Sequence, residues 1–241
     1  TVGIIDDVSH TSLVYDPEWR TDHSKVRAVF YGLGSDGTVG ANKNTAKIIG
    51  HSTPMHVQAY FVYDSKKSGS TTVSHVRVDD QPIDRSYLID QATFVGVHQW
   101  GLLEQLDVLA LAAPGATVLL NSPFPTDEVW ARMPVEAQQQ VRAGGLSLYA
   151  IDAAAVAQQA GLGGRINTVM QACFFALAGV LPADAAMTEL RNAIEHSYGA
   201  RGDIVVARNL AAVDQAVSNM HRVPVGPGIG GAWSADRKSV V

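Results

Sequence analysis

The chain has 241 residues, of which 46% are hydrophobic and 17% charged, and its formal net charge is −5 at pH 7. This length and hydrophobic content are enough for a single domain with a sizeable buried core. The chain has no block of basic residues, which argues against nucleic-acid binding, and no apolar run near the ~20 residues of a membrane span. The charged fraction is below the ~25% of an average protein, which indicates either that partner domains cover part of the surface or that the chain comes from an alanine-rich genome.

Strand-like and helix-like patterns alternate from residue 26 to residue 151. β-Branched and aromatic runs predict strands at 26–31, 55–63, 71–78, 94–97, 117–120 and 146–151. Helical periodicity predicts helices at 40–49, 102–111, 126–133 and 136–142, and after Asp152 a nearly continuous helical region with breaks at 161–164, Pro182 and 199–202. Strict two-residue alternation in 71–78 predicts a half-exposed strand.

This alternation predicts an α/β fold: a doubly wound, mostly parallel, Rossmann-like sheet with a C-terminal group of helices. In such sheets ligands bind beyond the carboxyl ends of the strands. Four polar or glycine-rich segments follow predicted strands and are expected at that edge: 32–44, 64–69, 98–99 and 121–122. Their convergence predicts a binding crevice.

The first of these segments is dense in glycine and leads into a helix. Glycine lets a ligand approach the backbone closely, and a helix N-terminus attracts anions, most often phosphate. The binding candidates are Gly34, Ser35, Asp36, Gly37, Thr38, Val39, Lys43 and Asn44, with Lys43 expected in the first helical turn. A carboxylate is unfavourable beside an anion, so capping of the helix is the favoured role of Asp36. A tight turn whose glycines serve packing alone is the other interpretation.

The glycine spacing is also compatible with another type of ligand, a dinucleotide. Gly32, Gly34 and Gly37 match the G-x-G-x-x-G spacing of dinucleotide-binding turns. The acidic residue expected roughly 20 positions later is only loosely matched by Asp64. The alternative function is therefore an independent NAD(P)-binding oxidoreductase domain. A Walker loop is excluded because Gly-Lys-Ser/Thr does not occur.

Other polar residues are candidates around the same crevice. Asn121 is either a ligand contact or, as favoured, a turn-stabilising residue. Arg165, expected at a helix start, is either a contact for an anion or a neighbouring domain, or a solvated side chain. Lys66 and Lys67 are either a phosphate contact or a solvated pair. Among the eight histidines only His98 is expected at the crevice edge, and neither a metal site nor an autonomous catalytic residue is predicted.

Several longer motifs point to a known family; they lie at 31–44, 60–69, 73–77, 119–125, 163–168 and 170–175. In this order they resemble the gamma domain of pyruvate:ferredoxin (flavodoxin) oxidoreductases, large thiamine-diphosphate and iron–sulfur enzymes that oxidise pyruvate to acetyl-CoA. The resemblance covers residues 1 to about 223. It implies a gamma domain at 25–223 after a connector at 1–24, and coenzyme A (CoA) as the ligand whose phosphates the 34–39 turn would cradle.

The same resemblance implies cofactors and partners outside this chain. Thiamine diphosphate, Mg²⁺ and [4Fe–4S] clusters would belong to other domains of one polypeptide, because the single cysteine, Cys173, falls short of the roughly four thiolates of a cluster. Ferredoxin or flavodoxin, or NADP⁺ through a fused reductase, would accept the electrons. The full enzyme would be a homodimer, and the lone cysteine favours a reducing cytoplasm. The chain alone is expected to be inactive.

The two ends are expected to lie outside the domain proper. The chain begins at Thr1 without methionine, which indicates a fragment. Residues 224–241 depart from the family pattern, and their last part resembles a translated adapter, so a disordered, artefactual tail is predicted. Apolar stripes at 182–198 and 203–221 either dock partner domains or close the domain's own sheet.

Overall fold

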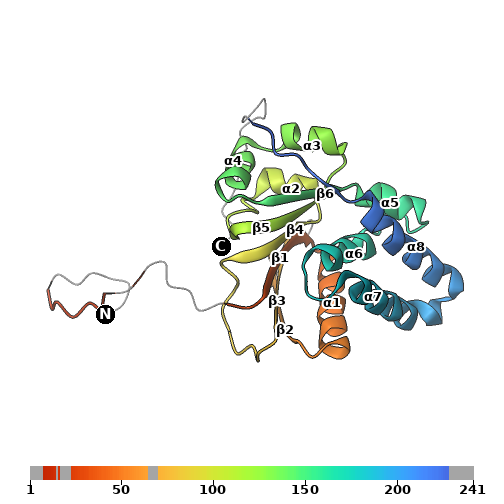
Figure 1. Ribbon diagram of the computed structural model, residues 1–241, viewed down its shortest axis with the longest axis horizontal. Helices are drawn as coiled ribbons and strands as arrows, with labels where there is room; N and C mark the ends of the chain where they lie inside the picture. Colours follow the sequence, from red (N-terminus) through yellow and green to blue (C-terminus); the bar gives the residue numbers. More distant parts are fainter. Residues whose placement is uncertain (1–7, 15, 17–22, 65–69, 228–241) are drawn as a thin grey trace.

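The computed structural model describes residues 8–14, 16, 23–64 and 70–227. These residues form an α/β domain with helices on both faces of one mixed sheet (Figure 1). Seven strands within the described residues lie in the order β2-β3-β1-β4-β5-β6-β7. Their bounds are β1 Val26–Leu33, β2 His56–Tyr63, β3 Thr71–Asp79, β4 Ala92–Val97, β5 Ala112–Asn121, β6 Ser147–Ile151 and β7 His221–Arg222.

The centre of the sheet is parallel and its two sides are not. β1, β4, β5 and β6 are parallel neighbours, whereas β3 is antiparallel to β1 and β2, and β7 is antiparallel to β6. The predicted α/β class, with its mostly parallel sheet and C-terminal helices, is confirmed. Because β1 and β2 both run antiparallel to β3, they point the same way. The carboxyl ends of β1, β2, β4, β5 and β6 therefore share one edge.

Two hydrophobic cores fill the space between the sheet and its helices. The first lies under α1, α5, α6, α7 and α8, and includes a cluster of rings from Phe30, Phe94 and Phe174 with centroids 5.0–5.7 Å apart. The second lies under α2, α3 and α4. The helices are α1 Thr38–Ser52, α2 Trp100–Gln105, α3 Thr126–Arg132, α4 Val135–Ala143, α5 Ala153–Gln159, α6 Asn167–Leu177, α7 Ala183–Tyr198 and α8 Asp203–Asn219, with a 3₁₀ turn at Gly199–Arg201.

The expected half-exposure of strand 71–78 is wrong. β3 lies between β1 and β2, and all its residues after Thr71 are buried. On one face His75 accepts a hydrogen bond from the Ile89 amide (3.3 Å), and Arg77 donates to Gln58 (3.1 Å). Alternation of polar and apolar residues shows only that the two faces of a strand differ. Here the polar face is buried as well, because its side chains find hydrogen-bond partners inside the protein.

Two other predicted elements differ in extent. The helix expected at 102–111 ends at Gln105. Leu106 forms an isolated β-bridge, and residues 108–111, including the fully buried Val108, form a turn. β5 begins at Ala112, five residues earlier than predicted, and its pairing with β4 shifts register between Ala92 and Phe94. The two-residue strand β7 is absent from the prediction, since so short a pairing depends on an extended segment meeting the edge of β6.

The C-terminal helices close the domain on itself. Ala186, Leu190 and Ile194 of α7 are buried in the core shared with α6 and α8. Of the two roles left open for this apolar stripe, the structure therefore shows the internal one. Residues 224–227 of the predicted tail lie against the α3–α4 side, where Arg142 donates a hydrogen bond to the carbonyl of Pro227 (2.7 Å); residues 228–241 and most of the connector lie outside the described residues.

Candidate functional site

The glycine-rich turn lies at the carboxyl end of β1, where strand order reverses and α1 and α2 leave on opposite faces. Asp36 organises this turn. Its carboxylate accepts hydrogen bonds from the amides of Leu33 (2.8 Å) and Thr38 (2.9 Å) and from the side chain of Gln99 (3.3 Å). The predicted capping role of Asp36 is confirmed, and its negative charge is spread over three donors.

Other amides of the turn have no acceptor among the described residues. They belong to Ser35, Gly37, Val39 and Gly40, since the first turn of a helix leaves its N–H groups without intrahelical partners. The positive end of the 15-residue helix α1 lies at the same place. The exposed turn therefore offers several donors and a favourable potential to one anion.

Two glycines are required by the geometry of the turn. A Cβ atom on Gly32 would lie 2.2 Å from the Thr38 hydroxyl oxygen, so no larger residue fits there. Gly37 has a φ of 84° and a Cβ placed on it would lie 3.2 Å from the Cβ of Asn167. Packing therefore explains these two glycines, as one of the two interpretations predicted.

A buried pair of side chains joins α1 to β4 beneath the turn. Thr38 Oγ1 and His98 Nδ1 share a hydrogen bond of 2.8 Å, and the His98 amide donates to the carbonyl of Tyr31 (2.9 Å). His98 is 2% exposed, and burial lowers its pKa to about 4, while the nearby carboxylate of Asp36 opposes this shift. The imidazole is therefore neutral at pH 7, and its partner is the first residue of α1.

Asn121 connects three chain segments at the same edge. Its amide nitrogen donates to the carbonyl of His98 (2.9 Å), and its amide oxygen accepts from the amide of Ala153 (3.0 Å). Both ends of the side chain are thus used by the backbone, which confirms the favoured turn-stabilising role. A ligand contact by Asn121 stays a prediction.

Lys43 and Asn44 lie on different flanks of α1. Because α1 begins at Thr38, Lys43 falls in the second turn rather than the first, and its ammonium lies 5.3 Å from the ring centroid of Phe61 on β2. Asn44 instead lines a pocket between α1, α6 and α7. Lys66 and Lys67, also expected near this edge, lie outside the described residues.

The start of α6 lies beside the glycine turn, since Asn167 is the neighbour of Gly37. Arg165 precedes this helix by two residues instead of opening it, and it is exposed. Its Nε donates to the carbonyl of Leu162 (3.1 Å). Helix α6 thus begins within the 163–168 motif that the sequence places at its start, and the two roles left open for Arg165 stay predictions.

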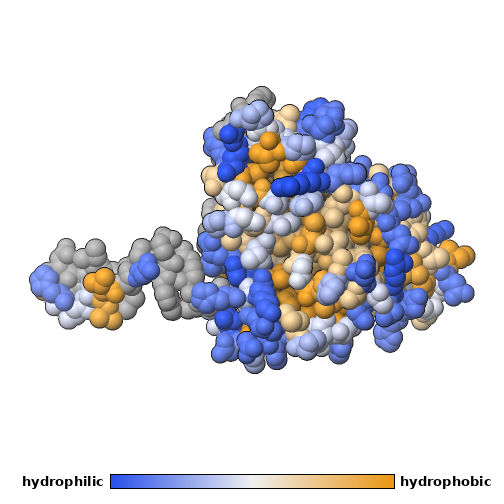
Figure 2. Space-filling view, viewed as in Figure 1, coloured by the Kyte–Doolittle hydropathy of each residue, from blue (hydrophilic) through white to orange (hydrophobic). Residues whose placement is uncertain are grey.

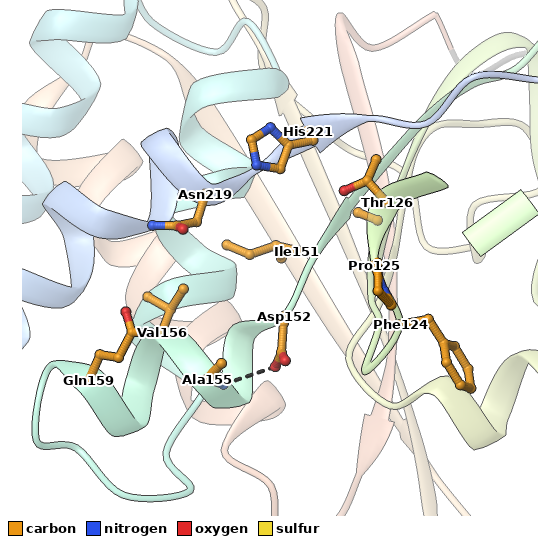
Figure 3. A pocket seen from close by; sticks show the side chains of 11 residues that line it. Phe124, Pro125, Thr126, Ile151, Asp152, Ala155, Val156, Gln159, Asn219 and His221 are labelled. Carbon is orange, nitrogen blue, oxygen red and sulfur yellow. Dashed lines mark hydrogen bonds between the residues drawn. The ribbon is translucent and has the colours of Figure 1, made fainter. Parts of the chain in front are cut away.

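A second hollow lies further along the same edge and has a volume of about 160 Å³ (Figure 3). Its walls come from the loop between β5 and α3, the turn between β6 and α5, and the segment that joins α8 to β7. The Asp152 carboxylate accepts a hydrogen bond from the Ala155 amide (2.9 Å) and so faces its own helix. A hollow this small holds a few water molecules, since each occupies ~30 Å³ in the liquid.

Within the described residues, no group of three or more histidine, cysteine, aspartate or glutamate side chains is placed to hold a metal ion. Cys173 is buried, and burial raises the pKa of its thiol to about 12. The expectation that it is an inert core residue is confirmed by its place in α6. A four-thiolate cluster does not fit a chain with one cysteine.

Comparison with known proteins identifies the family. The model of the pyruvate ferredoxin/flavodoxin oxidoreductase family matches residues 27–219. The chain belongs to this family. It is 56% identical over 234 residues to pyruvate-flavodoxin oxidoreductase from Nostoc, a match that covers 97% of this chain and 20% of that protein. The probable pyruvate-flavodoxin oxidoreductase of Escherichia coli is 48% identical over 94% of this chain and 19% of its own length. The chain thus spans about a fifth of these family members.

Solved structures share the fold at low sequence identity. The PORC subunit of Thermotoga maritima pyruvate oxidoreductase has a TM-score of 0.64 at 16% identity, covering 83% of this chain and 98% of that one. A 2-oxoglutarate:ferredoxin oxidoreductase from Magnetococcus marinus, solved with 2-oxoglutarate, coenzyme A and succinyl-CoA, has a TM-score of 0.60 at 16% identity over 80% of this chain and 30% of that one. These matches support the α/β architecture described above.

Sequence patterns alone miss part of the site. They predict His98 at the crevice edge, but its partner Thr38 lies 60 positions away and no local signal connects them. Asn167 lies in a glycine-rich motif whose approach to Gly37 depends on the packing of α6 against α1. For Gln99, the only indication in the sequence is its position after a predicted strand.

Proposed function

We propose that this chain is the gamma domain of a pyruvate:ferredoxin or flavodoxin oxidoreductase, which converts pyruvate and CoA to acetyl-CoA and CO₂ and reduces a small electron carrier. The high identity to pyruvate-flavodoxin oxidoreductases supports this assignment. Since the chain spans about a fifth of those proteins, thiamine diphosphate, Mg²⁺ and the iron–sulfur clusters are assigned to the rest of the polypeptide. The proposal includes a homodimeric, cytoplasmic enzyme.

Within that enzyme, the glycine turn is proposed to hold the phosphates of CoA. The observation that carries this role is the group of unpartnered amides at Gly37, Val39 and Gly40, directly at the positive end of α1. The related Magnetococcus enzyme, which contains this fold, binds coenzyme A in its solved structure. The Asp36 carboxylate of the turn is taken up by three hydrogen bonds within the domain, so the proposed task of the turn is to bind and orient CoA.

The strand order argues against the alternative function, an independent NAD(P)-binding oxidoreductase domain. In a dinucleotide fold the acidic residue for the ribose follows the strand next to the glycine turn. Here β3 is inserted between β1 and β2, so Asp64, after β2, is two strand spacings or about 10 Å from β1. The Asp64 amide also continues the pairing with β3 by donating to the Thr71 carbonyl (3.0 Å). CoA binding is therefore favoured over NAD(P).

The surface is consistent with a domain that other domains cover in part. Figure 2 shows hydrophobic residues gathered in the middle of one face, with hydrophilic residues around them. No helix within the described residues is long and apolar enough to cross a bilayer. We propose that other domains of the same polypeptide cover part of this hydrophobic area, as the low charge content suggests.

Calorimetric titration tests the CoA assignment in the complete polypeptide that carries this chain. CoA, NAD⁺ and NADPH are titrated separately into the wild type, Gly37→Ala and Gly115→Ala. Gly115 is the control because it also has a positive φ, 76°, but lies at the start of β5 with open space around it. Saturable CoA binding that Gly37→Ala weakens and Gly115→Ala preserves supports the role. Binding of a nicotinamide cofactor in place of CoA would overturn it.

A further inference from the structure

The two edges of the sheet are protected to different degrees. β7, at one edge, is two residues long and carries the positively charged Arg222. β2, at the other edge, has eight residues, and they include no lysine, arginine, aspartate, glutamate, proline or glycine. Natural sheets protect an open edge with short strands, charges, prolines or bulges, because an unprotected edge pairs with other strands. By these criteria β7 is a protected edge and β2 is not (Figure 1).

β2 is also regular along its whole length. All eight residues pair with β3 in one register, from His56 opposite Asp79 to Tyr63 opposite Thr72, without a bulge. A long, regular edge strand presents an uninterrupted row of hydrogen-bonding groups to any further strand. β2 therefore has the properties of an internal strand but lies at the margin of the described sheet.

One hydrogen bond just beyond β2 shows which backbone groups face the open edge. The Asp64 amide donates to the Thr71 carbonyl (3.0 Å), and in antiparallel pairs the residues that bond to the partner strand alternate with residues that do not. The even-numbered residues of β2 therefore bond to β3, and the backbone groups of the odd-numbered residues face outward. The outward residues are Val57, Ala59, Phe61 and Tyr63. Within the described residues, no hydrogen bond takes up their amides.

The side chains at this edge are aromatic, with one ammonium group above them. Tyr60 and Tyr63 are each 57% exposed. The ammonium of Lys43, on α1, lies 5.3 Å from the ring centroid of Phe61 and makes no ion pair with another described residue. Aromatic and oppositely charged pairs across neighbouring strands stabilise a sheet. The edge therefore offers backbone groups, aromatic rings and a positive charge to an added strand.

We propose that β2 is an internal strand in the complete protein, because an extended segment from another domain of the same polypeptide adds a strand beside it. The chain spans about a fifth of the relatives that it matches, so most of such a polypeptide lies outside this domain. The proposal rests on the proposed function, in which other domains surround this one. The added segment is apolar or aromatic where it meets Tyr60 and Tyr63, and it carries a carboxylate close to Lys43.

A second copy of β2 is a less suitable partner. Two β2 strands would pair antiparallel about a twofold axis, and the register with Tyr60 opposite itself uses all the outward backbone groups. This register also places both Lys43 side chains on the same face of the sheet near the axis, since Lys43 contacts Phe61, the neighbour of Tyr60. Two ammonium groups in this arrangement repel each other. A segment that carries a carboxylate replaces this repulsion by attraction.

Hydrogen exchange in the complete polypeptide, read residue by residue, tests the pairing and contains its own control. The amides of Gln58, Tyr60 and Val62 face β3 and are protected whether or not a further strand is present. With the edge paired, the amides of Ala59 and Phe61 should exchange within about tenfold of the rate of these neighbours. Faster exchange than that would overturn the proposal. Protected outward amides in a polypeptide that does not bind CoA would contradict the role of the glycine turn and leave the added strand supported.

Photo-cross-linking identifies where the added strand comes from. Benzoylphenylalanine is incorporated in place of the exposed Tyr60 in the complete polypeptide, and the same variant unfolded in urea is the control. A product that keeps the mass of one polypeptide on a denaturing gel, and joins β2 to a segment outside residues 1–241, supports the proposal. A product of twice that mass shows pairing with a second copy and overturns it. Absence of any product specific to the folded state also overturns it.

Discussion

Two strand-to-helix turns at the carboxyl edge of this sheet have a similar construction but differ in whether they leave helix amides available. Each follows a parallel strand, and each uses an aspartate to cap the next helix: Asp36 before α1 and Asp152 before α5. In the turn before α5, side chains occupy the amides of both Ala153 and Ala155. In the turn before α1, the capping aspartate occupies Thr38 and leaves the next amides available. A capped helix at this edge is therefore a binding candidate only where glycines leave the backbone open.

The largest loss of folding stability is expected from a substitution that fills the glycine turn. Gly32→Ala places a methyl group 2.2 Å from the Thr38 hydroxyl oxygen and 2.6 Å from the Thr38 Cβ. We expect a loss of about 3 kcal/mol in the free energy of unfolding, measured by urea denaturation. Gly164→Ala, where a Cβ meets no neighbour, is the control and should change stability by less than about 0.5 kcal/mol. Equal stability of the two variants would contradict the close packing of Thr38 on β1.

Asn121 is shared by the two turns, so its removal should weaken both. Asn121→Ala leaves the His98 carbonyl and the Ala153 amide without their side-chain partners. We expect a loss of about 2 kcal/mol in unfolding free energy, because partly buried backbone groups lose hydrogen bonds. Asn219→Ala, which removes one exposed bond to the Gln215 carbonyl, is the comparison and should cost far less. A small effect at Asn121 would show that water replaces the lost partners.

Acidification should act through the buried imidazole beneath the first turn. The pKa of His98 is about 4 in the folded chain and 6.5 when unfolded, because burial disfavours its charge. The unfolded chain therefore takes up the proton first, so stability is full above pH 6.5 and falls as the pH drops toward 4. We expect about 2 kcal/mol to be lost between pH 7 and pH 5 through this group. His98→Gln should flatten the profile by that amount and leave the contribution of the buried His75, whose pKa is also about 4.

The smallest expected effect is the difference in stability between removing one cap and removing the other. Asp36 accepts three hydrogen bonds, whereas the described contact of Asp152 is one bond to Ala155 on an exposed turn. Asp36→Ala should cost about 2 kcal/mol and Asp152→Ala about 1 kcal/mol, both measured by thermal unfolding. If Asp152→Ala costs more, the turn before α5 depends more on its aspartate than its single bond implies.

The sequence was enough to predict the α/β class, the positions of most strands and helices, and the edge at which polar turns meet. These features follow from local patterns: runs of β-branched residues, helical periodicity, and glycines between them. The capping role of Asp36 followed from the same local chemistry, since its partners lie two or three residues away. Long motifs also indicated the family, which the match over residues 27–219 shows.

Only the tertiary structure decided which side chains meet. The alternation in β3 gave no sign that a neighbouring strand and the 80–91 segment would bury its polar face. The pairing of Thr38 with His98, the place of Asn167 beside Gly37, and the pocket between α1, α6 and α7 all join residues that are far apart in the chain. Local patterns fix backbone conformation, but contacts over such separations depend on how the helices pack on the sheet, because that packing minimises exposed apolar area over the whole domain.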